Sequence, residues 1–260
     1  MESSTNSKTS IKSPIDWRII GVIVALTIAY GIAVSQEVEG EFHVTDGMYL
    51  SGIVACGIMS LFVSKRYFGS EVFGKAYFFL GIGFLSWLVA EVIWHYHILV
   101  LNIDAYPAWW DPFFLAFYVL SIFHLVLNTR YFRRKWNSKI KAWLIGVPII
   151  IVSGYIFTAY SEWGEYDELL FDLFYGALFI GLSSIVFTFA IFGAMIFRES
   201  ALGNAWLLLA VGLVILGIAD FGYYHLEISE SFTLGHPLNS VWILAFMIIF
   251  YGLYKHLKVI

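Results

Sequence analysis

The sequence is poor in charge and in cysteine, and it lacks the short motifs of several enzyme classes. Only 13% of its 260 residues are Asp, Glu, Lys or Arg, whereas soluble domains carry about 25%. Its one cysteine, Cys56, excludes an internal disulfide and a metal cage built from cysteines. We find no phosphate-binding glycine loop, no serine nucleophile elbow and no HExxH zinc motif. No lysine stands in the middle of the last apolar runs, where a retinal would need one. We expect no nucleic-acid partner.

What the chain has in abundance is apolar sequence. Hydrophobic residues make up 60% of it, and the mean hydropathy is +0.79. A helix that crosses the hydrocarbon layer, about 30 Å thick, needs about 20 apolar residues. Eight runs meet this requirement and leave no room for a separate soluble domain. They predict an all-α integral membrane protein, a single unit surrounded by the lipid bilayer. The predicted helices span residues 14–35, 46–64, 75–99, 112–129, 142–160, 169–197, 204–225 and 237–256.

Lysine and arginine lie only at alternate ends of these predicted helices. All fifteen fall in the two terminal segments or around the second, fourth and sixth loops. The other four loops carry acids instead: Glu37, Glu39, Glu41, Asp104, Glu162, Glu165, Asp167 and Glu230. The positive-inside rule therefore predicts a multi-pass protein of the cell membrane with both termini in the cytoplasm. Residues 1–13 are polar and predict a disordered cytoplasmic N-terminus, and residues 130–141 predict a basic cytoplasmic loop.

The two halves of the chain resemble each other. A shift of 129 residues aligns the third predicted helix with the seventh without a gap, and it places Glu91 opposite Asp220 and Gly83 opposite Gly212. A shift of 126 aligns Asp46 with Asp172. This spacing predicts two four-helix membrane repeats, residues 14–129 and 142–257. Because each repeat has an even number of helices, the two would be parallel and related by an axis along the membrane normal.

Acidic residues inside the predicted helices mark a candidate site. Glu91 lies about 24 Å along its helix from the cytoplasmic end at 1.5 Å per residue, which places it in the outer half of the bilayer. A charge at mid-membrane costs about 2.5–3.5 kcal/mol, so such residues usually face a cavity or a partner. His95 follows Glu91 by four residues and shares its helix face. The candidates for an outward-facing site that binds a cation, a proton or a metal are Glu91, Asp220, His95, His225, Asp172 and Asp46. If a metal ion is the cofactor, its candidate ligands are Glu91, His95 and Asp220.

Structural roles for the same residues stay open. Asp46 and Asp172 lie near predicted helix starts, where an acid can cap free N–H groups. Glu91 and Asp220 come too late in their helices for that role. They could be protonated, or hydrogen-bonded to Tyr, Trp or His across the bundle to fix helix register. His95 and His97 are two residues apart, so they cannot both ligate one ion from a regular helix.

Two loosely matching motifs resemble the uncharacterised multi-helix membrane sensor regions that precede diguanylate cyclase or histidine kinase domains in bacteria. Those regions show an acid-x-x-Trp/Tyr near the outer end of one helix, and then Asp-x-x-aromatic with another aromatic residue four positions on. The matching residues are Glu91, Trp94, Asp111, Phe114 and Tyr118 in the first half, and Asp220, Tyr223, Asn239, Trp242 and Phe246 in the second. The resemblance covers about half of the chain and departs from the pattern at Glu91 and Asn239, where the regions carry Asp.

The resemblance implies a membrane sensor. The chain ends at Ile260, directly after the last predicted helix, so a sensor of this kind is expected to signal through a partner membrane or signalling protein. Three alternatives remain: a small proton- or cation-coupled transporter, a membrane-embedded metal-dependent hydrolase, and a structural subunit of a membrane complex. The sequence predicts no catalytic residue and leaves the oligomeric state open.

Overall fold

A computed structural model describes residues 14–36, 42–70, 72–103, 108–131, 136–160, 168–229, 231–233 and 235–259. These residues form eight α-helices and one π-helical turn, and they contain no strand. The helices are α1 (Trp17–Val34), α2 (Val44–Arg66), α3 (Phe73–Tyr96) continued by the turn η1 (His97–Leu101), α4 (Asp111–Arg130), α5 (Ser138–Ala159), α6 (Glu168–Phe197), α7 (Gly203–Ile228) and α8 (Asn239–Val259). The prediction of an all-α chain is confirmed.

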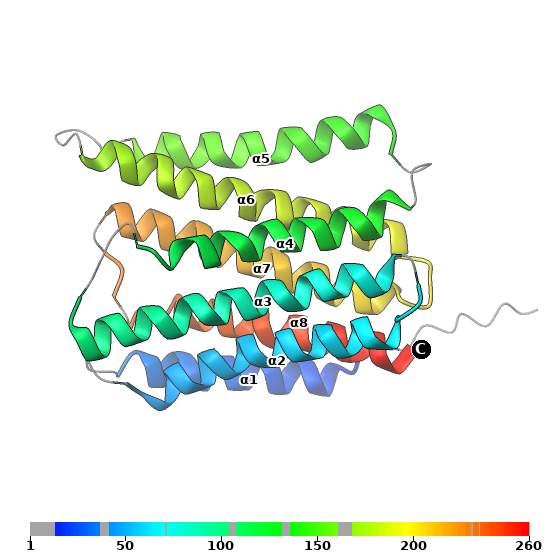
Figure 1. Cartoon of the computed structure of the whole chain (residues 1–260), viewed down its shortest axis with the longest axis horizontal. Helices are drawn as coiled ribbons and strands as arrows, with labels where there is room; N and C mark the ends of the chain where they lie inside the picture. The colour runs from blue at the N-terminus through cyan, green and yellow to red at the C-terminus, as the bar shows by residue number, and fades with distance from the viewer. Residues whose placement is uncertain are drawn as a thin grey trace, which may run out of the picture.

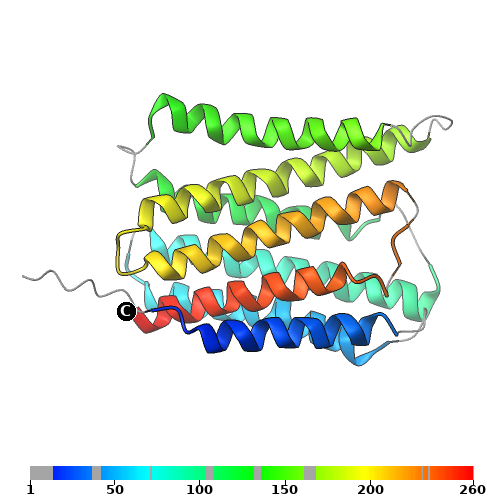
Figure 2. The ribbon, with the colours of Figure 1, turned by 180° about the vertical axis from the view of Figure 1, so that it is seen from behind.

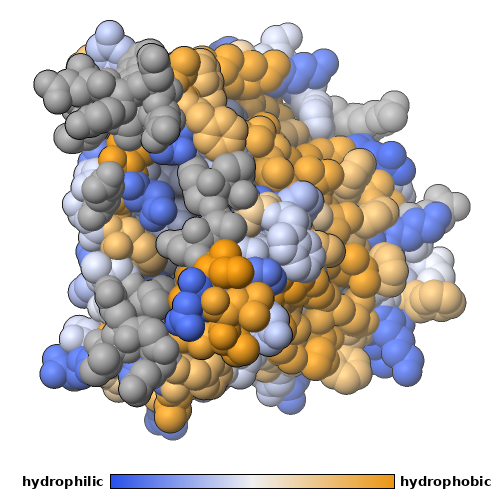
Figure 3. All heavy atoms as spheres, turned by 60° about the vertical axis from the view of Figure 1, so that its left-hand side comes forward, coloured by the Kyte–Doolittle hydropathy of each residue, from blue (hydrophilic) through white to orange (hydrophobic). Residues whose placement is uncertain are grey.

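Within the described residues, eight helices are long and apolar enough to cross a membrane. Large apolar side chains on their outer faces stay exposed, such as Ile150 and Phe157 on α5. In Figure 3, hydrophilic side chains gather on the end of the bundle that faces the viewer, and the apolar sides of the helices extend behind it. Helix length, composition and surface thus agree with a multi-pass membrane protein.

Six of the helices form a closed ring. Neighbours around the ring are in contact in the order α2, α3, α4, α6, α7, α8 and back to α2. Helix α1 packs outside the ring, mainly on α8, and α5 packs outside it on α6 (Figures 1 and 2). The contact between α1 and α8 includes a hydrogen bond from the backbone N–H of Asp16 to the Tyr251 hydroxyl at 2.9 Å. Helices α3 and α7 therefore lie on opposite sides of the ring.

The helices run along the long axis of the molecule, and each is antiparallel to the next (Figure 1). We call the end at which α2, α4, α6 and α8 begin the acidic end, because the loops there carry acids and neither lysine nor arginine. It is the left-hand end in Figure 1. We call the opposite end, where the lysines and arginines lie, the basic end. The segment 1–13 and four residues of the basic loop, 132–135, lie outside the described residues.

Local sequence explains several of the helix starts. The Asp16 carboxylate accepts a hydrogen bond from the Arg18 backbone N–H, and Asn137 accepts one from Ile140, so both residues cap free N–H groups of a first turn. Pro112 occupies the first turn of α4, where its missing N–H has no cost.

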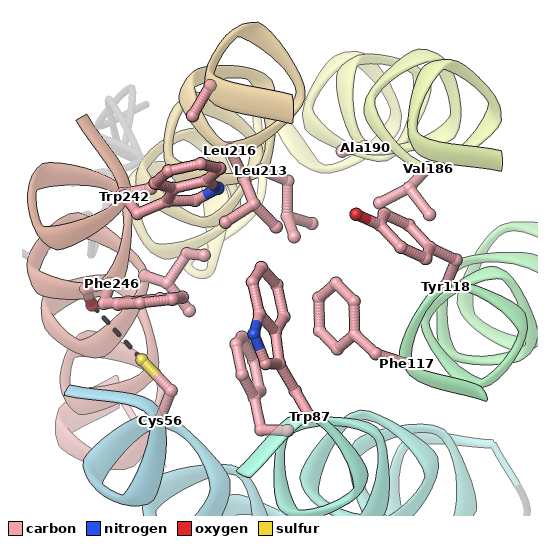
Figure 4. Packing of buried hydrophobic residues seen from close by; sticks show 14 of the residues in the cluster. Cys56, Trp87, Phe117, Tyr118, Val186, Ala190, Leu213, Leu216, Trp242 and Phe246 are labelled. Carbon is pink, nitrogen blue, oxygen red and sulfur yellow. Dashed lines mark hydrogen bonds between the residues drawn. The ribbon is translucent and has the colours of Figure 1, made fainter. Parts of the chain in front are cut away.

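Packed aromatic rings fill the middle of the ring of helices. Trp87 of α3 points into the centre (Figure 4) and lies edge-to-face against Phe117 and Phe246, with ring centroids 4.7 and 5.5 Å apart. The Cys56 thiol donates to the Phe246 carbonyl oxygen at 3.2 Å. Phe117, Phe246 and Cys56 are at most 1% exposed. The centre is therefore a solid core.

A polar cluster lies between this core and the basic end. The Tyr77 hydroxyl and His256 Nε2 are 2.7 Å apart, and His124 Nδ1 lies 3.0 Å from the Ala76 carbonyl oxygen. All three side chains are fully buried. Both histidines are therefore core residues.

Candidate functional site

The ring of helices encloses a cavity of about 230 Å³ at its acidic end. All six ring helices and α1 contribute side chains to its lining. The 21 lining residues are Tyr30, Val34, Asp46, Tyr49, Trp87, Glu91, Trp94, His95, Trp110, Asp111, Phe114, Tyr118, Tyr175, Phe179, Asp220, Tyr223, Tyr224, Glu227, Phe232, Asn239 and Trp242.

The lining is aromatic and anionic. Thirteen of the 21 residues are Trp, Tyr or Phe, and five are Asp or Glu. No lysine or arginine lines the cavity among the residues that the structure describes. The loops of the acidic end also lack both residues in the sequence. The carboxylates therefore face the cavity without a permanent positive charge beside them.

Glu91 occupies the α3 side of the cavity and is 7% exposed. Its Oε1 accepts hydrogen bonds from Trp87 Nε1 at 2.9 Å and from the Tyr49 hydroxyl at 3.1 Å. Trp87 precedes it by one helical turn, whereas Tyr49 reaches across from α2. The Oε2 atom lies 3.7 Å from His95 Nδ1. A buried carboxylate is thus fixed in orientation by one oxygen, while the other lies beside an imidazole.

Asp220 occupies the α7 side and is 3% exposed. Its Oδ2 accepts a hydrogen bond from Ser183 Oγ at 2.7 Å, and its Oδ1 accepts one from Trp242 Nε1 at 3.1 Å. The Tyr118 hydroxyl of α4 interacts with the same carboxylate. Asp220 therefore joins three further helices, α6, α8 and α4. The hydrogen bonds that Glu91 and Asp220 form with Tyr, Trp and Ser agree with the idea that these acids fix helix register.

Asp46 and Asp111 combine a capping role with a place in the cavity lining. Asp46 is the third residue of α2, and its Oδ2 accepts a hydrogen bond from the His43 backbone N–H at 2.8 Å. Asp111 begins α4 and accepts one from the Ala108 backbone N–H at 2.7 Å. The second oxygen of Asp46 lies 3.7 Å from His95 Nε2. His95 thus bridges Asp46 and Glu91, and it belongs to the acidic group on this side.

The structure brings four of the six predicted site residues together: Glu91, Asp220, Asp46 and His95. Asp172 and His225 do not line the cavity. Asp172 is the fifth residue of α6 and lies near Tyr155, so the idea that it is a helix N-cap is wrong. His225 is half-buried on α7, and its Nδ1 has no hydrogen-bond partner among the described residues.

The two sensor-like motifs converge on the cavity. Nine of their ten residues line it, and the tenth, Phe246, lies in the core beneath. Figure 4 shows Tyr118 and Trp242, one from each motif, on opposite sides of Trp87. The motif positions chosen from the sequence thus share one location in space.

The sequence did not single out Tyr49, Trp87 or Ser183, which hold the two deep carboxylates. Trp87 had a usable signal, since it precedes Glu91 by four residues and a Trp N–H needs a partner when it is buried. Ser183 had none, because its partnership with Asp220 depends on how α6 and α7 are rotated about their axes.

The donor atoms of the described residues are not arranged as a metal centre. Among the described residues, no group of three or more His, Cys, Asp or Glu side chains is arranged to hold a metal ion. Among the described residues of the lining, His95 supplies the only imidazole, and its nitrogens lie 3.7 Å from two carboxylates. What the arrangement can do chemically is bind positive charge over an aromatic surface.

Comparisons with protein-family models, with curated proteins and with solved structures gave no match for this chain, so a functional assignment depends on the geometry of the cavity.

Proposed function

We propose that the chain is a membrane-embedded sensor or binding module whose cavity receives a positively charged ligand. The observation that carries this proposal is the lining of the cavity, in which five acidic residues and no lysine or arginine surround one space among the described residues. Carboxylates in a partly desolvated cleft attract and hold cations, because few water molecules screen them there.

The proposal includes a repeat of two parallel four-helix units. Exchange of the halves turns α2 into α6 and α4 into α8. The contact between α2 and α8 is then replaced by the contact between α6 and α4, and both contacts are present. Glu91 and Asp220 occupy equivalent places on opposite helices of the ring. The outer helices break the correspondence, since α1 packs mainly on α8 whereas α5 packs on α6.

The proposed orientation places the acidic end outside the cell. Its basis is the distribution of the fifteen lysines and arginines, none of which falls in the loops of that end. In this orientation the cavity collects its ligand from outside the cytoplasm, as expected of a sensor.

A binding module agrees better with the core than a transporter does. A transport path has to continue from the cavity toward the other end of the bundle. Between the cavity and the basic end, however, Trp87, Phe117 and Phe246 fill the middle of the ring of helices. The Trp87 side chain is in direct contact with the other two. Transport would require α3, α4 and α8, which carry these three residues, to move apart. Ligand binding requires only the existing space.

Charge-selective thiol labelling tests the proposed site and its orientation. In a Cys56→Ala background, Asn239→Cys places one thiol in the lining of the cavity. Intact cells are treated with a membrane-impermeant methanethiosulfonate reagent that carries either a trimethylammonium or a sulfonate group. We expect the cationic reagent to react at least about tenfold faster, because the negative potential of the carboxylates attracts the trimethylammonium group and repels the sulfonate group.

The matched control is Ser35→Cys, an exposed position at the acidic end that does not line the cavity. Adding Glu91→Gln and Asp220→Asn should reduce the preference at position 239 and leave the one at position 35 unchanged. Equal rates for the two reagents at position 239 would refute an anionic cavity. Labelling only in inverted vesicles would show that the cavity opens to the cytoplasm.

A further inference from the structure

We infer that the ligand of this cavity is a small organic ammonium ion, such as an alkylammonium or quaternary ammonium compound. The inference rests on the proposed function, since it names the chemical class of the cation that the cavity receives. Three features of the described residues support it: the aromatic side chains of the cavity wall, the hydrogen bonds that the buried carboxylates already accept, and the volume of the cavity.

Aromatic side chains form most of the cavity wall, and several of them pack edge-to-face. Tyr223, Phe232 and Trp242 pack edge-to-face on the α7–α8 side, with centroid distances of 4.8 Å between Tyr223 and Phe232 and 5.8 Å between Tyr223 and Trp242. In an edge-to-face pair, the face of one ring is left for another contact. An organic cation within about 6 Å of a ring centroid is attracted by the negative face of the ring, most strongly with Trp and Tyr.

The deep carboxylates supply charge but already have hydrogen-bond donors. Oε1 of Glu91 and both side-chain oxygens of Asp220 accept hydrogen bonds from the protein. They are therefore better suited to neutralise a cation at short range than to replace its hydration shell as direct metal ligands. A quaternary ammonium ion needs no hydrogen bonds, so it matches a wall of rings with two buried carboxylates behind it.

The size of the cavity agrees with a small organic molecule. Its volume of about 230 Å³ is far more than a bare metal ion occupies, and it lies below the roughly 300–1,000 Å³ of sites for drug-sized ligands. No metal-binding group of three or more residues exists in the part of the chain that the structure describes. Both facts favour a compact organic cation over a bare metal ion.

Calorimetric titration of the 260-residue chain in lipid nanodiscs tests the inference. The probes are choline, tetramethylammonium and 3,3-dimethyl-1-butanol, the uncharged isostere of choline. We expect saturable binding of at least one ammonium probe and at least about tenfold weaker binding of the uncharged alcohol. The comparison separates attraction of a cation by rings and carboxylates from burial of apolar surface alone.

Ring removal supplies the matched variants. Trp94→Leu combined with Phe232→Leu removes two rings of the lining and should weaken ammonium binding by about tenfold or more. Phe157→Leu removes a ring that is 82% exposed on α5 and should leave binding unchanged. Unchanged elution in size-exclusion chromatography shows that each variant is folded.

Three results would overturn the inference. The first is that the alcohol binds as tightly as choline. The second is that neither ammonium probe binds at concentrations up to millimolar. The third is that zinc or calcium binds stoichiometrically and that this binding is lost in Glu91→Gln/Asp220→Asn. The first two, with charge-selective labelling at position 239 intact, would leave an anionic cavity for another cation. Loss of that labelling preference is the result that refutes the proposed function itself.

Discussion

Two buried tyrosines of the core differ in whether their hydroxyl groups have a hydrogen-bond partner. The Tyr77 hydroxyl lies 2.7 Å from His256 Nε2, whereas that of Tyr155 is buried and has no hydrogen-bond partner among the described residues. Both rings are fully buried. The pair therefore separates the contribution of a buried hydrogen bond from that of ring packing.

We predict that Tyr77→Phe lowers the free energy of unfolding by about 1–3 kcal/mol, because it leaves a buried imidazole nitrogen without its partner. Tyr155→Phe should be neutral or slightly stabilising, since it removes a polar atom that is buried without a hydrogen bond. Equilibrium unfolding of the two purified variants beside the natural sequence measures both effects. Equal losses would contradict the assignment of the Tyr77–His256 hydrogen bond.

At the scale of single residues, the sequence singled out Glu91 and Asp220 but not three of the side chains that donate hydrogen bonds to them. Glu91 and Asp220 stood out because ionisable residues are rare inside membrane helices. Their partners Trp87, Tyr49 and Ser183 belong to residue types that are common throughout the chain. Only the rotation of each helix about its axis brings them to a carboxylate. Apolar side chains face both lipid and core, so hydropathy carries little information about that rotation.

Helix boundaries were predictable because charge and turn residues interrupt the apolar runs. Seven of the helices begin and end within about four residues of the predicted limits, and the eighth, α3, differs mainly in that its last turn is the π-helical segment η1. A change of hydrogen-bond register has no signal in hydropathy. Asn102, which follows η1 with a φ of 52°, closes this irregular turn.

Close approach of α7 and α8 depends on glycine. A Cβ atom at Gly212 would collide with Ile249 Cγ1 and would lie 3.0 Å from the Ile249 backbone nitrogen. The second contact is with backbone, which a rotamer change cannot relieve. Small residues permit such close packing of membrane helices, and this contact closes the ring beside the aromatic core.

We predict that Gly212→Ala destabilises the protein by about 1–3 kcal/mol, because the added methyl group forces α7 and α8 apart. Gly146→Ala is the matched control, since a Cβ atom at Gly146 on α5 has no neighbour within 4 Å. That control should be neutral or slightly stabilising, as alanine is the better helix former. Thermal unfolding of both variants measures the difference, and a larger loss at Gly146 would contradict the packing of α7 on α8.

For the whole molecule, the sequence predicted the number of helices but not the order in which they form a ring. Hydropathy orders helices along the chain, whereas ring order depends on contacts between distant segments such as α2 and α8 or α4 and α6. The difference between α1 and α5 was equally hidden, because both are apolar helices at corresponding positions in the two halves. The cavity exists only in the closed ring, and its aromatic wall could not be derived from either half alone.

Orientation decides which compartment the cavity serves. Helix α1 begins and helix α8 ends at the basic end, because the eight helices of the described residues alternate in direction. We predict that a green fluorescent protein fused after residue 260 is fluorescent and that alkaline phosphatase fused there is inactive, as expected of a cytoplasmic terminus. Alkaline phosphatase fused after Tyr160, at the acidic end, should be active. The opposite pattern would place the acidic cavity toward the cytoplasm, and its ammonium ligand would then have to be a cytoplasmic compound. The same reversal should appear in the thiol labelling at position 239, so the two measurements have to agree on one orientation.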